Sequence, residues 1–197
     1  MKQEPASEPS EIRFQNIVGM GLGFSSMIRL FEKDSEDKLW RKIVYDTAGR
    51  IFSTQSQEQF DNVHSEFCDW GMKNIVLAEK KRNGRIIKKR KPASYGQVAK
   101  TLDVTLKVVI YYCHLPDCET SRRLVKWLHA AVDTQMMRML ADEYPKEIQP
   151  WPTKIEDVDK AKYLAIQTSV LRFIDKKHNG SLSPVEFDDM YWYKLNP

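Results

Sequence analysis

Hydrophobic residues recur at helical spacing in the first half of the chain, and the alternation typical of strands is scarce. A third helical pattern begins after Pro92, where Ser94 is the expected N-cap, and ends before Pro116, which cannot continue a helix. The two earlier patterns lie within residues 37–80, the first around Leu39, Ile43 and Ala48 and the second around Phe60, Val63, Phe67 and Trp70.

The second half continues the helical pattern. A fourth segment covers about Glu119 to Glu143, and the proline-rich stretch from Tyr144 to Thr153 is predicted to be a loop. The chain thus contains six or more helical patterns without a repeat, which predicts an all-α single domain over residues 12–197, after a disordered tail at residues 1–11. A division of that domain into two lobes with a cleft between them stays open. The last two patterns lie around Tyr163, Ile166, Val170 and Phe173 and from Val185 to Leu195.

The composition narrows the class of protein. The 197 residues are 42% hydrophobic and 11% aromatic with a net charge of +4, which excludes a disordered chain. No apolar run reaches the roughly 18 residues of a membrane span, and the polar start MKQEPASEPSE differs from a signal peptide. Three cysteines without a regular framework fit a reducing compartment. We therefore expect a soluble, cytoplasmic monomer that does not bind membranes.

Positive charge is concentrated in one short segment, residues 80–91, which contains no acidic residue. Asn83-Gly84 in its middle is a type I′ turn signal, so a short hairpin is expected there. Such a segment is either a solvated loop or a site for nucleic acid or another polyanion, because each phosphate that it neutralises releases counterions. Its cationic residues are Lys80, Lys81, Arg82, Arg85, Lys88, Lys89, Arg90 and Lys91.

Three other motifs favour ordinary structural roles. Residues 175–186, DKKHNGSLSPVE, imitate a calcium loop, but Lys177 stands where an oxygen ligand is needed, so a Gly-containing turn between helices is preferred. Cys113, His114 and Cys118 lack the spacing of a zinc site, and the two cysteines are interpreted as buried structural thiols. The four histidines are scattered along the sequence. We expect no metal and no cofactor.

The most informative predicted helix runs from Ser94 to His114 and is apolar nearly all round, which places it in the middle of the protein. Only Lys100, Asp103 and Lys107 interrupt it, in one narrow wedge. Burial disfavours the charged form of a lysine. Either Asp103 pairs with one of these lysines within the helix, or Lys100 is a nucleophilic amine.

Two segments carry a resemblance to a known superfamily. Residues 96–100, GQVAK, and residues 128–133, LHAAVD, resemble the lysine and aspartate segments of the helix-hairpin-helix DNA glycosylases, nearest the archaeal 8-oxoguanine DNA glycosylase branch, whose hairpin is degenerate. The resemblance implies that Lys100 attacks the sugar C1′ and that Asp133 assists as a carboxylate. The hairpin signature Leu-Pro-Gly-Val-Gly is absent, and Ala131 replaces the proline that normally precedes Val-Asp. Residues 119–143 could therefore form one continuous helix with Asp133 on its surface.

Two functional hypotheses follow. The first is a DNA glycosylase that flips a damaged or modified base into a pocket between two lobes, in repair or in defence against phage DNA with modified bases. In it, the backbone amides of Gly96 and Gln97 hold a phosphate together with Lys88, Lys89 and Arg90. The second is a non-catalytic helical protein that binds nucleic acid or a partner, in which Lys100 is merely paired with Asp103. Candidates for contact with the base are Tyr95, Tyr111, Tyr112, Trp127 and Trp151.

Overall fold

The computed structural model describes residues 9–83 and 85–195, and it confirms the predicted all-α class. No helix in this part of the chain is both long and apolar enough to cross a membrane. The first helix begins at Pro9, so the expected tail is wrong for residues 9–11, and residues 1–8 lie outside the described part. The helices are α1 (Pro9–Phe24), α2 (Lys33–Lys42), α3 (Ala48–Phe52), α4 (Gln57–Asn74), α5 (Tyr95–Leu106), α6 (Cys118–Val125), α7 (Thr134–Glu143), α8 (Lys160–His178) and α9 (Pro184–Leu195).

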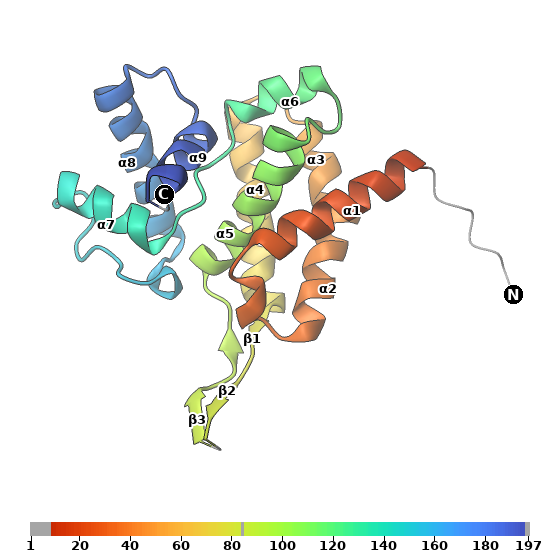
Figure 1. Cartoon of the computed structure of the whole chain (residues 1–197), viewed down its shortest axis with the longest axis vertical. Coiled ribbons are helices and arrows are strands. Elements are labelled where there is room, and N and C mark those ends of the chain that lie inside the picture. Colours follow the sequence, from red (N-terminus) through yellow and green to blue (C-terminus); the bar gives the residue numbers. More distant parts are fainter. Residues whose placement is uncertain (1–8, 84, 196–197) are drawn as a thin grey trace, which may run out of the picture.

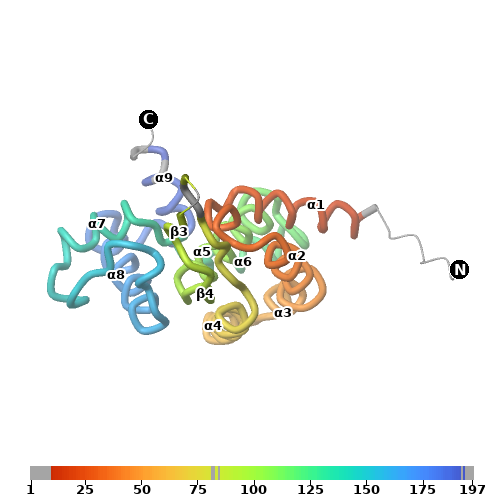
Figure 2. Tube along the Cα trace, turned by 90° about the horizontal axis from the view of Figure 1, so that it is seen from below, coloured from red at the N-terminus to blue at the C-terminus, as the bar shows by residue number. Residues whose placement is uncertain are grey.

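The helices form two groups on either side of α5 (Figures 1 and 2). Helices α1 to α4 lie on one side and α7 to α9 on the other. Helix α5 packs against α1, α4 and α8, so it lies in the centre as its apolar surface predicts. Its start is fixed by a capping box, in which Ser94 Oγ accepts a hydrogen bond from the Gln97 N–H and the Gln97 side chain accepts one from the Ser94 N–H. A π-helical segment, Lys107–Tyr112, continues it.

The fourth predicted segment is not one continuous helix. Helix α6 ends at Val125 and α7 begins at Thr134, with a non-helical stretch between them. Three residues of that stretch, Leu128, Ala130 and Val132, are buried. The Gln167 side chain forms hydrogen bonds with the backbone of Ala130. Gln167 Nε2 donates to the Ala130 carbonyl at 2.8 Å, while its Oε1 accepts from the Ala130 N–H at 3.2 Å. Two backbone groups that water cannot reach are thus paired without a helix.

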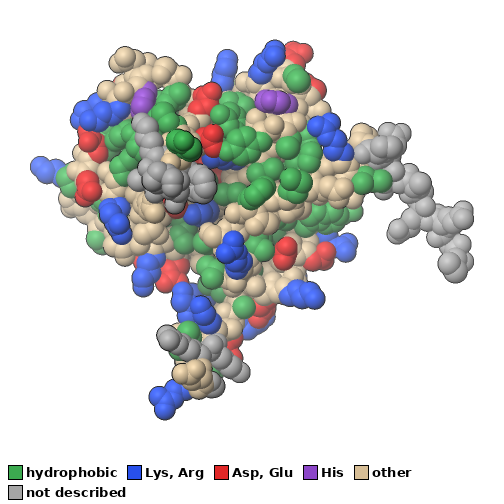
Figure 3. Space-filling view, viewed as in Figure 1, with side chains coloured by type: hydrophobic (Ala, Val, Ile, Leu, Met, Phe, Trp, Pro, Cys, Tyr) green, Lys and Arg blue, Asp and Glu red, His purple; other side chains and the backbone are tan. Residues whose placement is uncertain are grey.

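The basic segment forms the expected hairpin. Strands β2 (Lys80–Arg82) and β3 (Arg85–Lys88) pair antiparallel with Arg82 opposite Arg85, and Asn83 has a positive φ of 51°. A second short pair, β1 (Val76–Leu77) and β4 (Lys91–Pro92), joins the hairpin to the helices. The hairpin extends away from both groups of helices and presents lysine and arginine side chains (Figure 3), so its charge faces solvent.

The segment that imitates a calcium loop is a helix end and a turn, as preferred from the sequence. Helix α8 continues through Asp175 to His178, and Asn179 and Gly180 then take positive φ angles of 51° and 67°. Glu186 Oε2 accepts hydrogen bonds from the N–H and Oγ of Ser183 at 2.8 and 2.7 Å. This carboxylate therefore caps α9 instead of serving as a calcium ligand.

Candidate active site

A cavity of about 590 Å³ lies between the two groups of helices. Its size is within the range of ligand-binding cavities. Both residues of the predicted catalytic pair, Lys100 and Asp133, line it, and the end of α1 and helix α9 also contribute lining residues. The remaining lining residues are Phe24, Ser26, Val104, Lys107, Val108, Tyr112, Ala131, Asp188 and Asp189.

Lys100 presents a half-buried amine to this cavity. Burial lowers the pKa of its ammonium group, and the negative charges of Asp133, Asp188 and Asp103 raise it again only in part. Among the described residues, no ion pair or side-chain hydrogen bond holds Nζ. An amine with a lowered pKa and no partner is more often neutral than an ordinary lysine, which is the state that a nucleophile requires.

Asp103 does not pair with either lysine of α5, so that sequence interpretation is wrong. Its Oδ1 lies 2.8 Å from Nε2 of His64, and its Oδ2 accepts a hydrogen bond from the Tyr163 hydroxyl at 2.8 Å. Both carboxylate oxygens are thus engaged on the side of α5 that faces α4 and α8. Lys100 is left facing the cavity without this neighbour as a partner.

Lys107 lies in the same cavity but in a different electrostatic setting. Its Nζ is 2.9 Å from Asp188 Oδ2 and 3.0 Å from Asp189 Oδ1. Burial lowers the pKa of Lys107, but these two carboxylates outweigh it and the net shift is upward. The cavity therefore holds one amine that is fixed as a cation and one, Lys100, that is not.

Asp133 is positioned by the start of α7. Its Oδ1 accepts a hydrogen bond from the Met136 N–H at 2.8 Å, so it is the N-cap of that helix. The alternative of a surface acid on a continuous helix is therefore wrong. The cap fixes the carboxylate in orientation, and the positive end of the helix dipole favours its negative charge.

The aromatic lining differs from the sequence expectation. Of the five candidates, only Tyr112 lines the cavity. Tyr95 is buried in the core, and the Trp151 indole donates a hydrogen bond to the Tyr144 carbonyl. Tyr111 and Trp127 line a different surface pocket. Phe24, which is 69% exposed at the end of α1, also lines the cavity and was not among the expected residues. Asp188 and Asp189 were not among them either. No spacing pattern links these residues to Lys100, because three distant segments meet only in the fold.

The histidines are not as scattered as the sequence suggests. Between α4, α5 and α8, ligand atoms of His64, Asp103 and His129 lie within 4.8 Å of one another, an arrangement that could hold a metal ion. The Tyr163 hydroxyl already occupies the middle of this group, 3.0 Å from His129 Nδ1 and 3.4 Å from His64 Nε2. We interpret the group as a buried hydrogen-bond network that joins the two helix groups.

The three cysteines differ in how far they are buried. Cys68 is buried beside this network, with Sγ 3.8 Å from His64 Nδ1, whereas Cys113 is partly buried and Cys118 is exposed. Cys113 fits the prediction of buried structural thiols only in part, and the prediction is wrong for Cys118. Its position at the start of α6 explains the exposure, since Asp117 caps that helix at the surface.

The proposed phosphate contacts are only partly available. The Gly96 N–H donates to the Val158 carbonyl at 2.9 Å and the Gln97 N–H to Ser94 Oγ at 3.4 Å, so neither amide can hold a phosphate. Arg90 is paired with Glu32 through two contacts of 2.5 and 2.9 Å. The side chains of Lys80, Arg85, Lys88 and Lys89 are exposed, and those of Lys81 and Arg82 lie outside the description.

Comparison of the chain with protein-family models, with curated proteins and with solved structures finds no match. The function is therefore inferred from the residues of the site itself.

Proposed function

We propose that this protein is a DNA glycosylase that removes a damaged or modified base, with Lys100 as the amine nucleophile and Asp133 as the assisting carboxylate. The observation that carries the proposal is the contrast within one cavity. Burial lowers the pKa of Lys100, and no ion pair or hydrogen bond within the described part of the chain holds its Nζ, while Lys107 is held by two carboxylates. Asp133, whose carboxylate is the N-cap of α7, lines the same cavity as Lys100.

The chemistry requires both groups. When the bond between the base and C1′ breaks, its electron pair leaves with the base and positive charge develops on the sugar, which the fixed Asp133 carboxylate stabilises. The Lys100 nitrogen then forms a bond to C1′ and loses a proton to Asp133, and the departed base takes up a proton from water. When the C1′–O4′ bond breaks, the nitrogen lone pair forms the C=N bond of a protonated Schiff base and O4′ takes the proton from Asp133. Water can hydrolyse it, which releases the lysine.

The cavity offers surfaces that suit a flipped base. Phe24 and Tyr112 present exposed aromatic rings, on which a base can stack. Asp188 and Asp189 each contact Lys107 through one carboxylate oxygen, and the second oxygen of each can accept a hydrogen bond from an N–H group of a base edge. Stacking and edge contacts offset the few kcal/mol, roughly, that flipping costs.

The non-catalytic alternative loses its premise for Lys100, because Asp103 is occupied by His64 and Tyr163. A test measures base release from duplex and single-stranded oligonucleotides that carry a panel of oxidised, alkylated, deaminated and hypermodified bases. We expect release from at least one substrate by the wild type and its loss in Asp133→Ala. If every substrate stays intact while DNA is bound with unchanged affinity by Lys100→Ala, the protein is a binding protein.

A further inference from the structure

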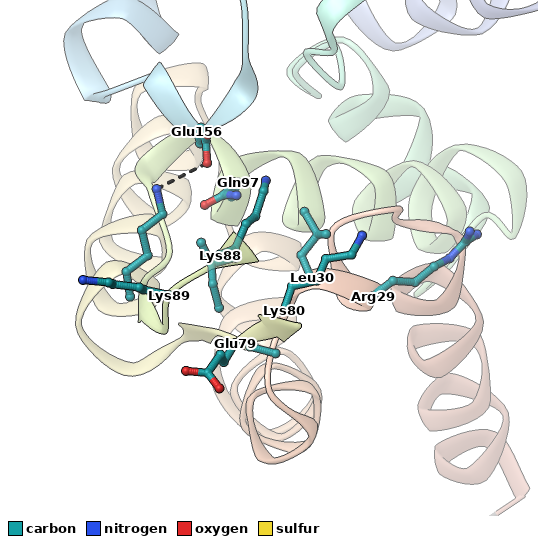
Figure 4. Close-up of a pocket in the computed structure, with 11 residues that line it drawn as sticks. Arg29, Leu30, Glu79, Lys80, Lys88, Lys89, Gln97 and Glu156 are labelled. Carbon is teal, nitrogen blue, oxygen red and sulfur yellow. Dashed lines mark hydrogen bonds and ion pairs between the residues drawn. The ribbon is translucent and has the colours of Figure 1, made fainter. Parts of the chain in front are cut away.

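A second cavity, of about 420 Å³, lies at the root of the hairpin. Its wall contains five cationic and two anionic side chains, so it carries a net positive charge. One of the two acids, Glu156, is already paired with Lys91 at 3.3 Å, and Glu79 points away from the cavity (Figure 4). The excess positive charge is therefore available to an anion.

Donor groups stand on two sides of this cavity. Figure 4 shows the Lys88 amine beside the Gln97 amide group, the Lys80 amine on the side of Leu30 and Arg29, and the Lys89 amine directed outward. Gln97 Oε1 accepts a hydrogen bond from the Ser94 N–H at 2.9 Å, which leaves Nε2 as a donor to the cavity. The Lys88 ammonium and the amide N–H₂ match the acceptor oxygens of a phosphate group, and Lys80 adds a second positive charge from the opposite side.

The apolar part of the wall fits the neighbouring sugar. Leu30 and Leu77 line the cavity between its charged residues. An apolar wall beside the cations lowers the local dielectric constant, so their attraction for an anion is stronger than on an open surface. The cavity is larger than a phosphate alone requires, which favours a phosphate that is part of a strand.

This cavity lies near the Lys100 cavity, because neighbouring residues of two segments line the two cavities. Gln97 lines one and Lys100 the other, three residues apart on α5 and thus roughly 5 Å along its axis. Arg29 and Ser26, also three residues apart, line the two cavities from the turn after α1. A phosphate held here therefore lies close, along the strand, to the base in the Lys100 cavity.

We propose that the cavity at the root of the hairpin binds one backbone phosphate of the DNA strand that is flipped, close to the reacting sugar. This inference rests on the proposed function, which fixes the position of that sugar. The backbone amides of Gly96 and Gln97 are already hydrogen-bonded within the protein. This cavity therefore takes their place as the phosphate site beside α5.

The test uses the full-length protein and a duplex that carries a tetrahydrofuran abasic analogue, which sets the register without knowledge of the base. Each phosphate near the analogue is replaced in turn by an uncharged methylphosphonate, and affinity is measured by fluorescence anisotropy. For the wild type we expect a loss of about tenfold at one position within two nucleotides of the analogue. In the double variant Lys80→Gln/Lys88→Gln, the ordinary duplex binds about tenfold more weakly and that position no longer matters.

Lys89→Gln is the matched control, because it removes the same charge from an amine that points outward. It should keep the full response to the methylphosphonate. An equal methylphosphonate loss in the wild type and the double variant would overturn the proposal. So would displacement of the duplex by millimolar inorganic phosphate, since the site would then serve free phosphate.

Failure of the proposed function is distinguishable from failure of this site. Lys100→Ala should retain the methylphosphonate response, because it removes the nucleophile and leaves the phosphate cavity intact. If the response is present but no base is released from any substrate, the glycosylase proposal fails and the phosphate site stands. If bases are released but no position responds, the phosphate site fails alone.

Discussion

Lys100 and Asp133 line the same cavity although they are 33 residues apart in the chain, and each is fixed by its own helix start. Lys100 lies in the second turn of α5, whose register is set by the Ser94 capping box. Asp133 is itself the cap of α7. Their proximity depends on the non-helical stretch before α7, which turns the chain back toward α5.

Asp133→Asn should lower the pKa of Lys100 further. The carboxylate stabilises the ammonium form, so its loss favours the neutral amine. In the wild type, the modification of Lys100 by trinitrobenzenesulfonate should rise with pH to a midpoint below the ordinary lysine value of about 10.4. In Asp133→Asn the midpoint moves to lower pH. Asparagine also caps helices, so the fold is retained.

The measurement is the rate of modification at Lys100, followed by peptide mapping at a series of pH values. Lys107 provides the internal comparison, because Asp188 and Asp189 raise its pKa and its midpoint should lie above that of Lys100. A midpoint for Lys100 that rises or stays constant in Asp133→Asn contradicts the electrostatic coupling of the pair.

Tyr163→Phe should destabilise the protein by about 1–3 kcal/mol in free energy of unfolding. The hydroxyl donates to Asp103 Oδ2 and also contacts His129 Nδ1, so its removal leaves buried polar groups without a partner. Urea unfolding followed by circular dichroism measures the change. Tyr45→Phe is the control, because Tyr45 is 64% exposed and should change stability little. Equal stability of the two variants would show that the network does not stabilise the fold.

Gly96→Ala should reduce stability by about 1–3 kcal/mol through overpacking. A Cβ at this position would lie 2.6 Å from Val158 Cβ and 2.8 Å from the Ile155 carbonyl oxygen. Gly49→Ala is the matched control, since within the described residues no atom outside the surrounding helical backbone lies within 4 Å of its added Cβ, and alanine favours a helix by about 0.5–1 kcal/mol. Urea unfolding should move the two midpoints in opposite directions. A shift in the same direction would contradict the close packing of α5 against the 155–158 segment.

Local features were predictable from the sequence. The α5 start follows from Ser94 and Gln97, which lie within one turn of each other, and the hairpin follows from Asn83-Gly84 between basic residues. Each depends on neighbours in the chain, so a pattern of a few residues carries the information.

Long-range partners were not predictable. Asp103 pairs with His64 and Tyr163, which are 39 and 60 residues away, instead of with the lysines on its own helix. The break before α7 depends on Gln167, which is 37 residues from Ala130. Helical spacing favoured a continuous helix there, and a tertiary hydrogen bond overrode it. Asp188 and Asp189 of α9 also reach the cavity only through the tertiary fold, since they are more than 80 residues from Lys100 in the chain.

The most direct test of the central claim is capture of the covalent intermediate. The protein is incubated with the oligonucleotide panel and sodium borohydride, and the adduct is sought by denaturing gel and located by mass spectrometry. We predict an adduct on Lys100 that is absent in Lys100→Ala and present in Lys107→Gln, which removes the paired amine of the same cavity. An adduct that survives in Lys100→Ala, or base release with no adduct on Lys100, would contradict its assignment as the nucleophile.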